Sequence, residues 1–240
     1  MEPSRHSGHE TELRAVVDRY ARRPQDDRYS IFRPEVILSG QEWQREMLRL
    51  LSGPVGLSSA DLPRLRVVDV GCGHGGRLLD FLRYGFRPAN LVGLELLPDR
   101  VAYARSQLPA AVKIYDGDAS VADIEPGSQD IVFQSVVFSS LLSDEFQQEL
   151  AARMWSWLRP GGGIIWYDFI YDNPGNPDVR AVPLKRVRAL FPEAQMTVRR
   201  VTLAPPISRR VCRIHPMLYH VFNAIPALRT HLLCWIAKRS

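Results

Sequence analysis

The chain has 240 residues, which suits one α/β domain with additions, and its 45% hydrophobic content is ample for a buried core. No apolar run approaches the ~18 residues that a membrane span requires, the first residues lack the apolar stretch of a secretory signal, and the three cysteines are scattered without metal-ligand spacing. We therefore expect a cytoplasmic protein with free thiols, no transmembrane segment and no bound metal.

The net charge of +5 is unevenly distributed along the chain. Residues 176–240 hold 12 Lys or Arg but only two acidic residues, whereas the remainder holds 19 basic and 24 acidic residues. The basic tail would attract a phosphate, a carboxylate, an acidic polymer or a membrane surface, or it forms a solvated rim. Its charge says nothing about the oligomeric state.

Two helices are expected before the first strand. Residues 1–10 have the composition of a disordered segment, but apolar residues recur at helical spacing from Thr11 and again in residues 40–51. The apolar positions are Leu13, Val16, Val17 and Tyr20 in the first helix and Trp43, Met47, Leu48 and Leu51 in the second. We interpret residues 1–60 as an N-terminal helical cap.

The centre of the chain alternates strands with helices. Strands are predicted near residues 66–70, 90–95, 111–115, 130–134 and 163–169, and helices near 76–84, 99–107 and 143–158. This alternation predicts a parallel sheet with helices on both faces.

The C-terminal part adds a helix from Leu184 and strands from Met196 and His231. Residues 205–230, between those two strands, are far longer than the ~2–5 residues of a hairpin loop, and they contain aromatic, His and Arg side chains. Long structured insertions usually carry function or cover a site. We interpret this segment as a helical lid over a substrate.

The most specific motif is the stretch VVDVGCGHGG, residues 67–76. An apolar strand that contains Asp69 leads into a turn with glycine at every second position, Gly71, Gly73 and Gly75, and a helical pattern follows. Glycine permits a sharp turn and a close approach to a ligand, and a helix N-terminus favours an anionic or electron-rich group. The alternating glycines differ from the G-x-G-x-x-G spacing of dinucleotide-binding enzymes.

This motif resembles motif I of the class I S-adenosylmethionine (SAM)-dependent methyltransferases, and the elements that follow keep the family's order and spacing to about residue 170. Among these enzymes the chain resembles the small-molecule methyltransferase type 11 group. The resemblance implies SAM as the cofactor, with Asp69 near its methionine end and the loop residues Gly71, Cys72, Gly73 and Gly75 beneath it.

The resemblance also implies an α/β fold: a doubly wound, seven-stranded, mostly parallel sheet whose last strand is antiparallel. N-terminal helices precede this sheet, and a helical lid is inserted before the last strand. The SAM-binding core would then comprise residues 61–204, the lid residues 205–230 and the last strand residues 231–240.

Further cofactor contacts are expected at the ends of the next strands. Glu95 closes the second strand, and the resemblance makes it the acceptor for the ribose hydroxyls, with Leu96 beside it; a plain N-terminal helix acid is the alternative. Asp118 matches the family position at the adenine amino group and Ala119 the adjacent backbone amide, although this is also ordinary turn chemistry. Gln134, at the end of the fourth strand, is the last expected contact.

Asp168, at the end of the fifth strand, is the leading candidate for a catalytic base. His215 and His220, in the expected lid, are further candidates because histidine titrates near neutral pH. Tyr29, Phe32 and Arg33, in the loop between the N-terminal helices, could reach the pocket, or they only pack against the added helices. A dense cationic group in the lid could grip an acidic substrate: Arg209, Arg210 and Arg213.

These observations predict methyl transfer from SAM to a hydroxyl, less readily an amine, of a small-molecule or glycosidic acceptor that could be acidic. The Asn-Pro-Pro-Tyr type of sequence used for amino groups on bases is absent after the fourth strand. Three alternatives stay open: an RNA methyltransferase that stacks bases on Tyr219, Phe222 and Trp235, a non-catalytic SAM-binding module, and an NAD-dependent oxidoreductase.

Overall fold

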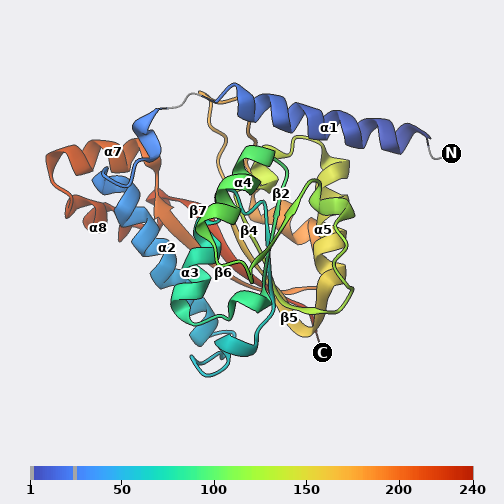
Figure 1. The fold of residues 1–240 in the computed structure, drawn as a ribbon. Helices are drawn as coiled ribbons and strands as arrows, with labels where there is room; N and C mark the ends of the chain where they lie inside the picture. Colours follow the sequence, from blue (N-terminus) through green and yellow to red (C-terminus); the bar gives the residue numbers. More distant parts are fainter. Residues whose placement is uncertain (1–2, 24–25, 240) are drawn as a thin grey trace.

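The computed structural model describes residues 3–23 and 26–239, and it contains a seven-stranded sheet in the order β3-β2-β1-β4-β5-β7-β6 (Figure 1). The strands are β1 (Val67–Val70), β2 (Leu91–Glu95), β3 (Lys113–Asp116), β4 (Gln129–Ser135), β5 (Leu158–Phe169), β6 (Gln195–Leu203) and β7 (Arg229–Ala237). Pairs among β1 to β5 are parallel, and β7 runs antiparallel to both of its neighbours, β5 and β6. The predicted doubly wound sheet with an antiparallel last strand is confirmed.

Helices cover both faces of the sheet, as Figure 1 shows. Side chains of α2, α3 and α4 pack on one face, and side chains of α1, α5 and α6 pack on the other. The helices are α1 (Pro3–Ala21), α2 (Pro34–Ser52), α3 (Gly76–Tyr84), α4 (Pro98–Gln107), α5 (Asp144–Trp157), α6 (Leu184–Leu190), α7 (Pro205–Ile214) and α8 (Leu218–Asn223).

The sheet order places a binding crevice beside β1. All four residues of β1 are buried, as expected for a parallel strand that is covered on both faces. The strand order reverses at β1, which pairs with β2 on one side and with β4 on the other. Ligands bind at such a switch point, outside the carboxyl ends of the strands.

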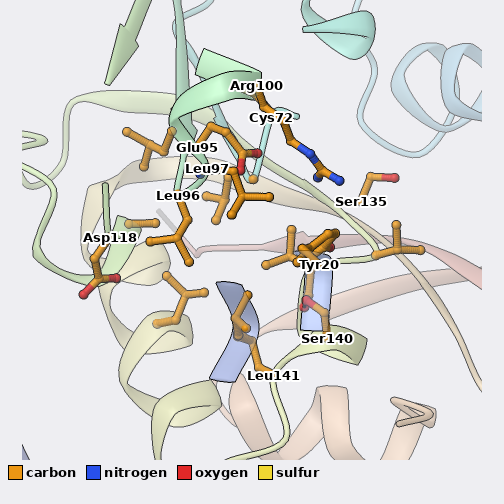
Figure 2. A pocket seen from close by; sticks show the side chains of 18 of the residues that line it. Tyr20, Cys72, Glu95, Leu96, Leu97, Arg100, Asp118, Ser135, Ser140 and Leu141 are labelled. Atoms are coloured by element: carbon orange, nitrogen blue, oxygen red, sulfur yellow. Dashed lines mark hydrogen bonds between the residues drawn. The ribbon is translucent and has the colours of Figure 1, made fainter. Parts of the chain in front are cut away.

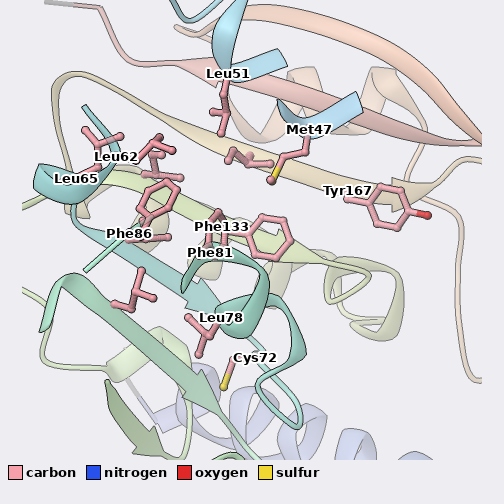
Figure 3. Packing of buried hydrophobic residues seen from close by; sticks show 14 of the residues in the cluster. Met47, Leu51, Leu62, Leu65, Cys72, Leu78, Phe81, Phe86, Phe133 and Tyr167 are labelled. Carbon is pink, nitrogen blue, oxygen red and sulfur yellow. The ribbon is translucent and has the colours of Figure 1, made fainter. Parts of the chain in front are cut away.

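The core face under α2 and α3 is shown in Figure 3. Met47 and Leu51 of α2 pack with Phe81 of α3 and Phe133 of β4, and all four are buried. Three of the four apolar positions predicted for α2 are therefore buried, Trp43 included, but Leu48 is 38% exposed, because it lies on the solvent side of the helix.

Helix α1 begins at Pro3, so the predicted disorder of residues 1–10 is wrong from Pro3 onward; the first two residues lie outside the described part. Tertiary contacts hold this helix. The carboxylate of Glu12 receives a hydrogen bond from Arg19 (2.7 Å) and another from the amide of Leu142 (2.8 Å), while Arg19 also donates to the carbonyl of Ser140 (2.9 Å). Composition alone does not reveal such partners.

Strand β5 begins at Leu158, five residues before the predicted start at residue 163. Leu158 pairs with Gln129, and a register shift between Gln129 and Ile131 lets the Pro-Gly-Gly segment bulge before regular pairing resumes at Gly163. The segment that looked like a turn is therefore an irregular part of the strand.

The insertion between β6 and β7 is helical, as predicted, and it packs beside α2 (Figure 1), but β7 begins at Arg229, two residues before the predicted start. Val211 and Tyr219 of the insertion form a small core with Leu203 of β6, against which Leu38 of α2 packs. The hydroxyl of Tyr219 donates to the carboxylate of Glu42 in α2 (2.6 Å). The insertion is therefore anchored to α2 through the buried carboxylate of Glu42.

Candidate functional site

The glycine turn between β1 and α3 has the tight backbone that its sequence predicts. Gly71 and Gly73 have φ angles of +67° and +56°, and a Cβ on Gly71 would lie 2.5 Å from Cγ2 of Val137. Gly75, with a φ of +82°, caps the N-terminus of α3. Between them, Cys72 is buried and its amide donates to the carbonyl of Leu94 (3.0 Å). Burial raises the pKa of the Cys72 thiol, so the thiol is protonated.

A cavity of about 560 Å³ opens at the carboxyl ends of β1, β2 and β4, and we call it the cofactor cavity. Figure 2 shows its side chains. Six of the residues predicted to bind the cofactor line it: Gly71, Cys72, Glu95, Leu96, Asp118 and Ala119. Gly73 and Gly75 lie in the same turn, and Asp69 lies in the strand that precedes it.

Glu95 connects the glycine turn after β1 with the residues that follow β2, at the edge of the cofactor cavity. Its Oε2 accepts a hydrogen bond from the amide of Gly73 (2.8 Å), and its Oε1 accepts one from the amide of Leu97 (3.0 Å). A carboxylate has about four acceptor positions. Glu95 therefore keeps acceptor capacity for a bound molecule, although it is only 5% exposed.

Asp69 is almost fully buried, with 1% of its surface exposed. Its Oδ2 has no hydrogen-bond partner among the described residues. Burial raises the pKa of this carboxyl well above its usual range, although the nearby Arg77 opposes the shift. A buried polar oxygen without a partner costs about 1–3 kcal/mol, and Asp69 itself does not line the cofactor cavity but lies beneath the turn that does.

Asp118, which also lines the cofactor cavity, is held in place by Ser120 and His9. Its Oδ1 accepts from the amide of Ser120 (2.8 Å), and its Oδ2 lies 2.8 Å from the hydroxyl of Ser120 and 2.5 Å from Nε2 of His9 in α1. The other ring nitrogen of His9 lies 3.1 Å from the carboxylate of Glu149 in α5. Helix α1 is thereby linked to the cavity and to α5.

Comparisons with known proteins agree with this geometry. Residues 67–162 match the family described as "Methyltransferase domain". A fatty-acid O-methyltransferase of Mycolicibacterium smegmatis is 33% identical over 122 residues, which cover 46% of this chain and 39% of the relative. Residues 67–162 therefore form a methyltransferase domain, in a chain that has the fold of the class I SAM-dependent methyltransferases. The predicted resemblance is confirmed.

Two further similarities bear on this methyltransferase domain. A tRNA N(3)-methylcytidine methyltransferase of Drosophila melanogaster is 27% identical over 124 residues, covering 48% of this chain and 38% of the relative. The crystal structure of a SAM-dependent methyltransferase from Mesorhizobium loti shares the fold, with a TM-score of 0.58 and 15% identity over 85% of this chain and 98% of that chain. Both curated relatives are much longer than the matched part, which spans about two fifths of their length.

Helix α1 forms one wall of the cofactor cavity of the methyltransferase domain. Leu13, Val16 and Tyr20 of α1 line the cavity, as does Arg23 just after the helix, and Figure 2 shows Tyr20 facing the cavity. The guanidinium carbon of Arg100 in α4 lies 4.4 Å from the centre of the Tyr20 ring. The sequence showed the apolar pattern of α1 but not the surface against which it packs.

The structure does not bring Gln134 to the cofactor cavity of the methyltransferase domain. Gln134 is fully buried: its Nε2 donates to the carbonyl of Tyr167 (3.3 Å), and its Oε1 accepts from the amide of Val137 (3.2 Å). Ser135 and Val136, the next residues, line the cavity instead. Gln134 therefore shapes the turn that follows β4.

The three candidate bases also lie away from the cofactor cavity. Asp168 is fully buried inside β5, where its carboxylate accepts from the amides of Ser139 (3.1 Å) and Phe169 (3.0 Å). Burial raises its pKa to about 7. His215 and His220 are exposed on the insertion.

Other expected contacts of the methyltransferase domain also fall outside the cofactor cavity. Tyr29 and Phe32 are 77% and 92% exposed, and neither is among the residues that line the cavity. His74 does line it, at the glycine turn, with its ring centre 5.0 Å from that of Tyr103. Within residues 3–23 and 26–239, no group of three or more His, Cys, Asp or Glu side chains has the arrangement of a metal site. Among the helices of these described residues, none combines the length and the apolar character that a membrane span needs.

Proposed function

We propose that the protein transfers the methyl group of SAM to an oxygen atom of a small-molecule acceptor. The observation that carries the proposal is the Glu95 carboxylate, which is tied to the glycine turn and keeps spare acceptor positions at the edge of the cofactor cavity. In this proposal Glu95 accepts hydrogen bonds from both ribose hydroxyls, and Leu96 packs beside them.

The rest of the cofactor cavity fits the other parts of SAM. Asp118 and the amide of Ala119 would bind the edge of the adenine, and the turn that begins at Gly71 would lie under the methionine part. The unpartnered oxygen of Asp69 would accept a hydrogen bond from the ammonium group. When bound, SAM supplies an activated methyl group together with its leaving group, so the protein has to position the acceptor and exclude water.

Helix α1 supports the exclusion of water from the cofactor cavity. Leu13, Val16 and Tyr20 present apolar surface to it, and Leu141 and Phe146 add apolar surface beside α1. A dry cavity strengthens the electrostatic interactions inside it.

A small-molecule acceptor fits better than RNA. The names of the two curated relatives specify a fatty acid and a tRNA base, and the fatty-acid enzyme shares the higher identity with this chain. Two of the aromatic side chains that base stacking would need, Tyr219 and Trp235, are buried, with exposures of 0% and 7%. They serve as core residues here.

An oxygen that is already ionised fits the site better than a neutral hydroxyl. A hydroxyl acceptor needs a base within about 3 Å. Asp168, His215 and His220 do not line the cofactor cavity. Of the residues that do, His74 packs its ring against Tyr103, and the carboxylate of Asp80 is paired with Arg77 and Arg83. The acceptor would therefore be an acid that carries its charge at neutral pH.

Calorimetric titration with SAM and with S-adenosylhomocysteine tests the proposal. We expect both to bind the wild-type protein and to bind Glu95→Gln at least about tenfold more weakly, because the new amide group opposes a donor and removes acceptor positions. Asp116→Asn, at the exposed end of the neighbouring strand β3, is the matched control and should bind normally. Absence of SAM binding by the wild type, or binding of NAD in its place, would refute the proposal.

A further inference from the structure

A second cavity of about 390 Å³ lies beside the cofactor cavity. Its walls come from the start of α2 and the residues before it, from α3, and from Tyr167 near the end of β5. Arg77 of α3 lines both cavities, so the two meet at its side chain. The size falls within the range of about 300–1,000 Å³ that is usual for small-molecule sites.

The walls of the second cavity combine apolar surface with positive charge. Ile31, Ile37 and Trp43 supply apolar surface, and Arg77 and Arg83 supply the charge. Within the described residues, its lining contains neither Asp nor Glu. These walls suit a molecule with an apolar body and a negatively charged end.

Arg77 is fixed where the two cavities meet. Its guanidinium carbon lies 3.6 Å from the centre of the Trp43 ring, and its Nη1 lies 3.2 Å from Oδ2 of Asp80. Arg83 approaches the same carboxylate, with its Nη1 3.6 Å from Oδ1. Two arginines therefore share one carboxylate, and the pair retains a net positive charge. Stacking on Trp43 leaves the edge of the guanidinium available for hydrogen bonds.

We propose that the second cavity is the acceptor site, and that the acceptor is a carboxylic acid with an apolar body whose carboxylate binds Arg77. This inference rests on the proposed methyl transfer. An acceptor carboxylate oxygen would form a bond to the methyl carbon while the carbon–sulfur bond breaks and its electron pair stays on sulfur. The products are a methyl ester and S-adenosylhomocysteine. A carboxylate carries no proton at neutral pH, so no base is required.

Binding of decanoate to the cofactor-free protein tests the site by calorimetry, with 1-decanol and decylamine as probes of equal chain length. We expect decanoate to bind most tightly, and Arg77→Gln to weaken its binding at least about tenfold, as for loss of a charge-assisted hydrogen bond. Arg45→Gln, an exposed arginine on α2 outside both linings, should bind decanoate as the wild type does. Equal binding of decanol or decylamine, or no effect of Arg77→Gln, would overturn the assignment.

A second pair of variants probes the apolar wall without altering Arg77. Ile37 is 44% exposed on α2, so Ile37→Glu should fold and should repel decanoate, while Leu48→Glu, 38% exposed on the same helix but outside both linings, should not. Equal decanoate binding by the two variants would contradict the site. SAM titration of the same proteins separates the two proposals: normal SAM binding without decanoate binding overturns the acceptor site alone, whereas loss of SAM binding by the wild type overturns methyl transfer.

Discussion

His9 and Asp118 are 109 residues apart in the sequence, yet Nε2 of His9 lies 2.5 Å from Oδ2 of Asp118. The same oxygen also accepts a hydrogen bond from the hydroxyl of Ser120 (2.8 Å). His9 therefore occupies the acceptor that we assign to the adenine amino group of SAM, and cofactor binding has to displace or share this contact. Helix α1 is at once a wall of the cofactor cavity and a competitor for one of its groups.

Removal of this competitor should strengthen cofactor binding. We expect His9→Ala to lower the Kd for SAM by about two- to tenfold, which corresponds to one hydrogen bond of about 0.5–1.5 kcal/mol. Glu10→Ala on the same helix removes an exposed ion pair with Arg14 and serves as the control, which should leave the Kd unchanged. Weaker SAM binding by His9→Ala would instead show that His9 helps to hold the cofactor.

The same contact predicts a pH dependence of cofactor binding. Burial lowers the pKa of His9, but hydrogen bonds and charge interactions with Asp118 and Glu149 outweigh it and raise the pKa. A raised pKa means that the charged contact is fully present below the ordinary histidine value of about 6.5 and is lost as the pH rises through the raised value. His9 faces Asp118, Ser120 and Glu149, and its ring packs edge-on against Phe146.

The Kd for SAM should therefore decrease between pH 6 and pH 8.5 in the wild type, because His9 loses its charge over that interval and its contact with Asp118 weakens. His9→Gln, which does not titrate, should show a flatter profile. Calorimetry at four pH values would measure both profiles. Parallel profiles for the two proteins would assign the pH dependence to other groups.

The fold and most of the cofactor contacts were predictable because their signals are local. The glycine turn and the carboxylate of Glu95 lie at the ends of strands, and parallel strands bring their carboxyl ends to one edge of the sheet. Successive side chains of a strand point to opposite faces of the sheet, so an error of one residue in position reverses the predicted direction of a side chain. Asp168 was expected near the end of its strand and facing the acceptor; β5 does end at Phe169, as predicted, but the Asp168 carboxylate is buried and accepts a hydrogen bond from the amide of Ser139.

The positions of α1 and of the insertion depend on contacts between distant parts of the chain. The apolar pattern of α1 indicated a helix, but the pairing of His9 with Asp118 had no local signal. The hydrogen bond from Tyr219 to Glu42 holds the insertion beside α2. In this position His215 and His220 are exposed. These contacts could not be deduced from spacing alone.

The close approach at Gly71 predicts that a methyl group there disturbs the glycine turn. Gly71→Ala places a Cβ 2.5 Å from Cγ2 of Val137 at a φ of +67°, so we expect a loss of about 1–3 kcal/mol in the free energy of unfolding. Gly76→Ala, in the first turn of α3, meets no atom within 4 Å and should be neutral or slightly stabilising. Urea denaturation of both variants measures the difference, and equal stabilities would contradict the tight turn.

Asp168 provides the sharpest test of a structural against a catalytic role. Burial raises its pKa to about 7, so between about pH 4 and pH 7 the folded protein binds more protons at this group than the unfolded chain does. The free energy of unfolding should therefore fall as the pH rises through this window, by up to roughly 4 kcal/mol at 1.36 kcal/mol per pH unit. Asp168→Asn is neutral throughout and keeps an oxygen for the amide of Ser139, so this part of the pH dependence should vanish.

Methyl transfer by Asp168→Asn should remain within about threefold of the wild-type rate, because the side chain does not line either cavity. Asp172→Asn, in the exposed loop that follows, is the matched control for both measurements. Urea unfolding at pH 5 and pH 8 measures the stability change, and labelled-methyl transfer measures the rate. A loss of about a hundredfold in rate with an unchanged pH dependence of unfolding would instead make Asp168 the base, since general-base catalysis contributes about 10²–10⁴-fold.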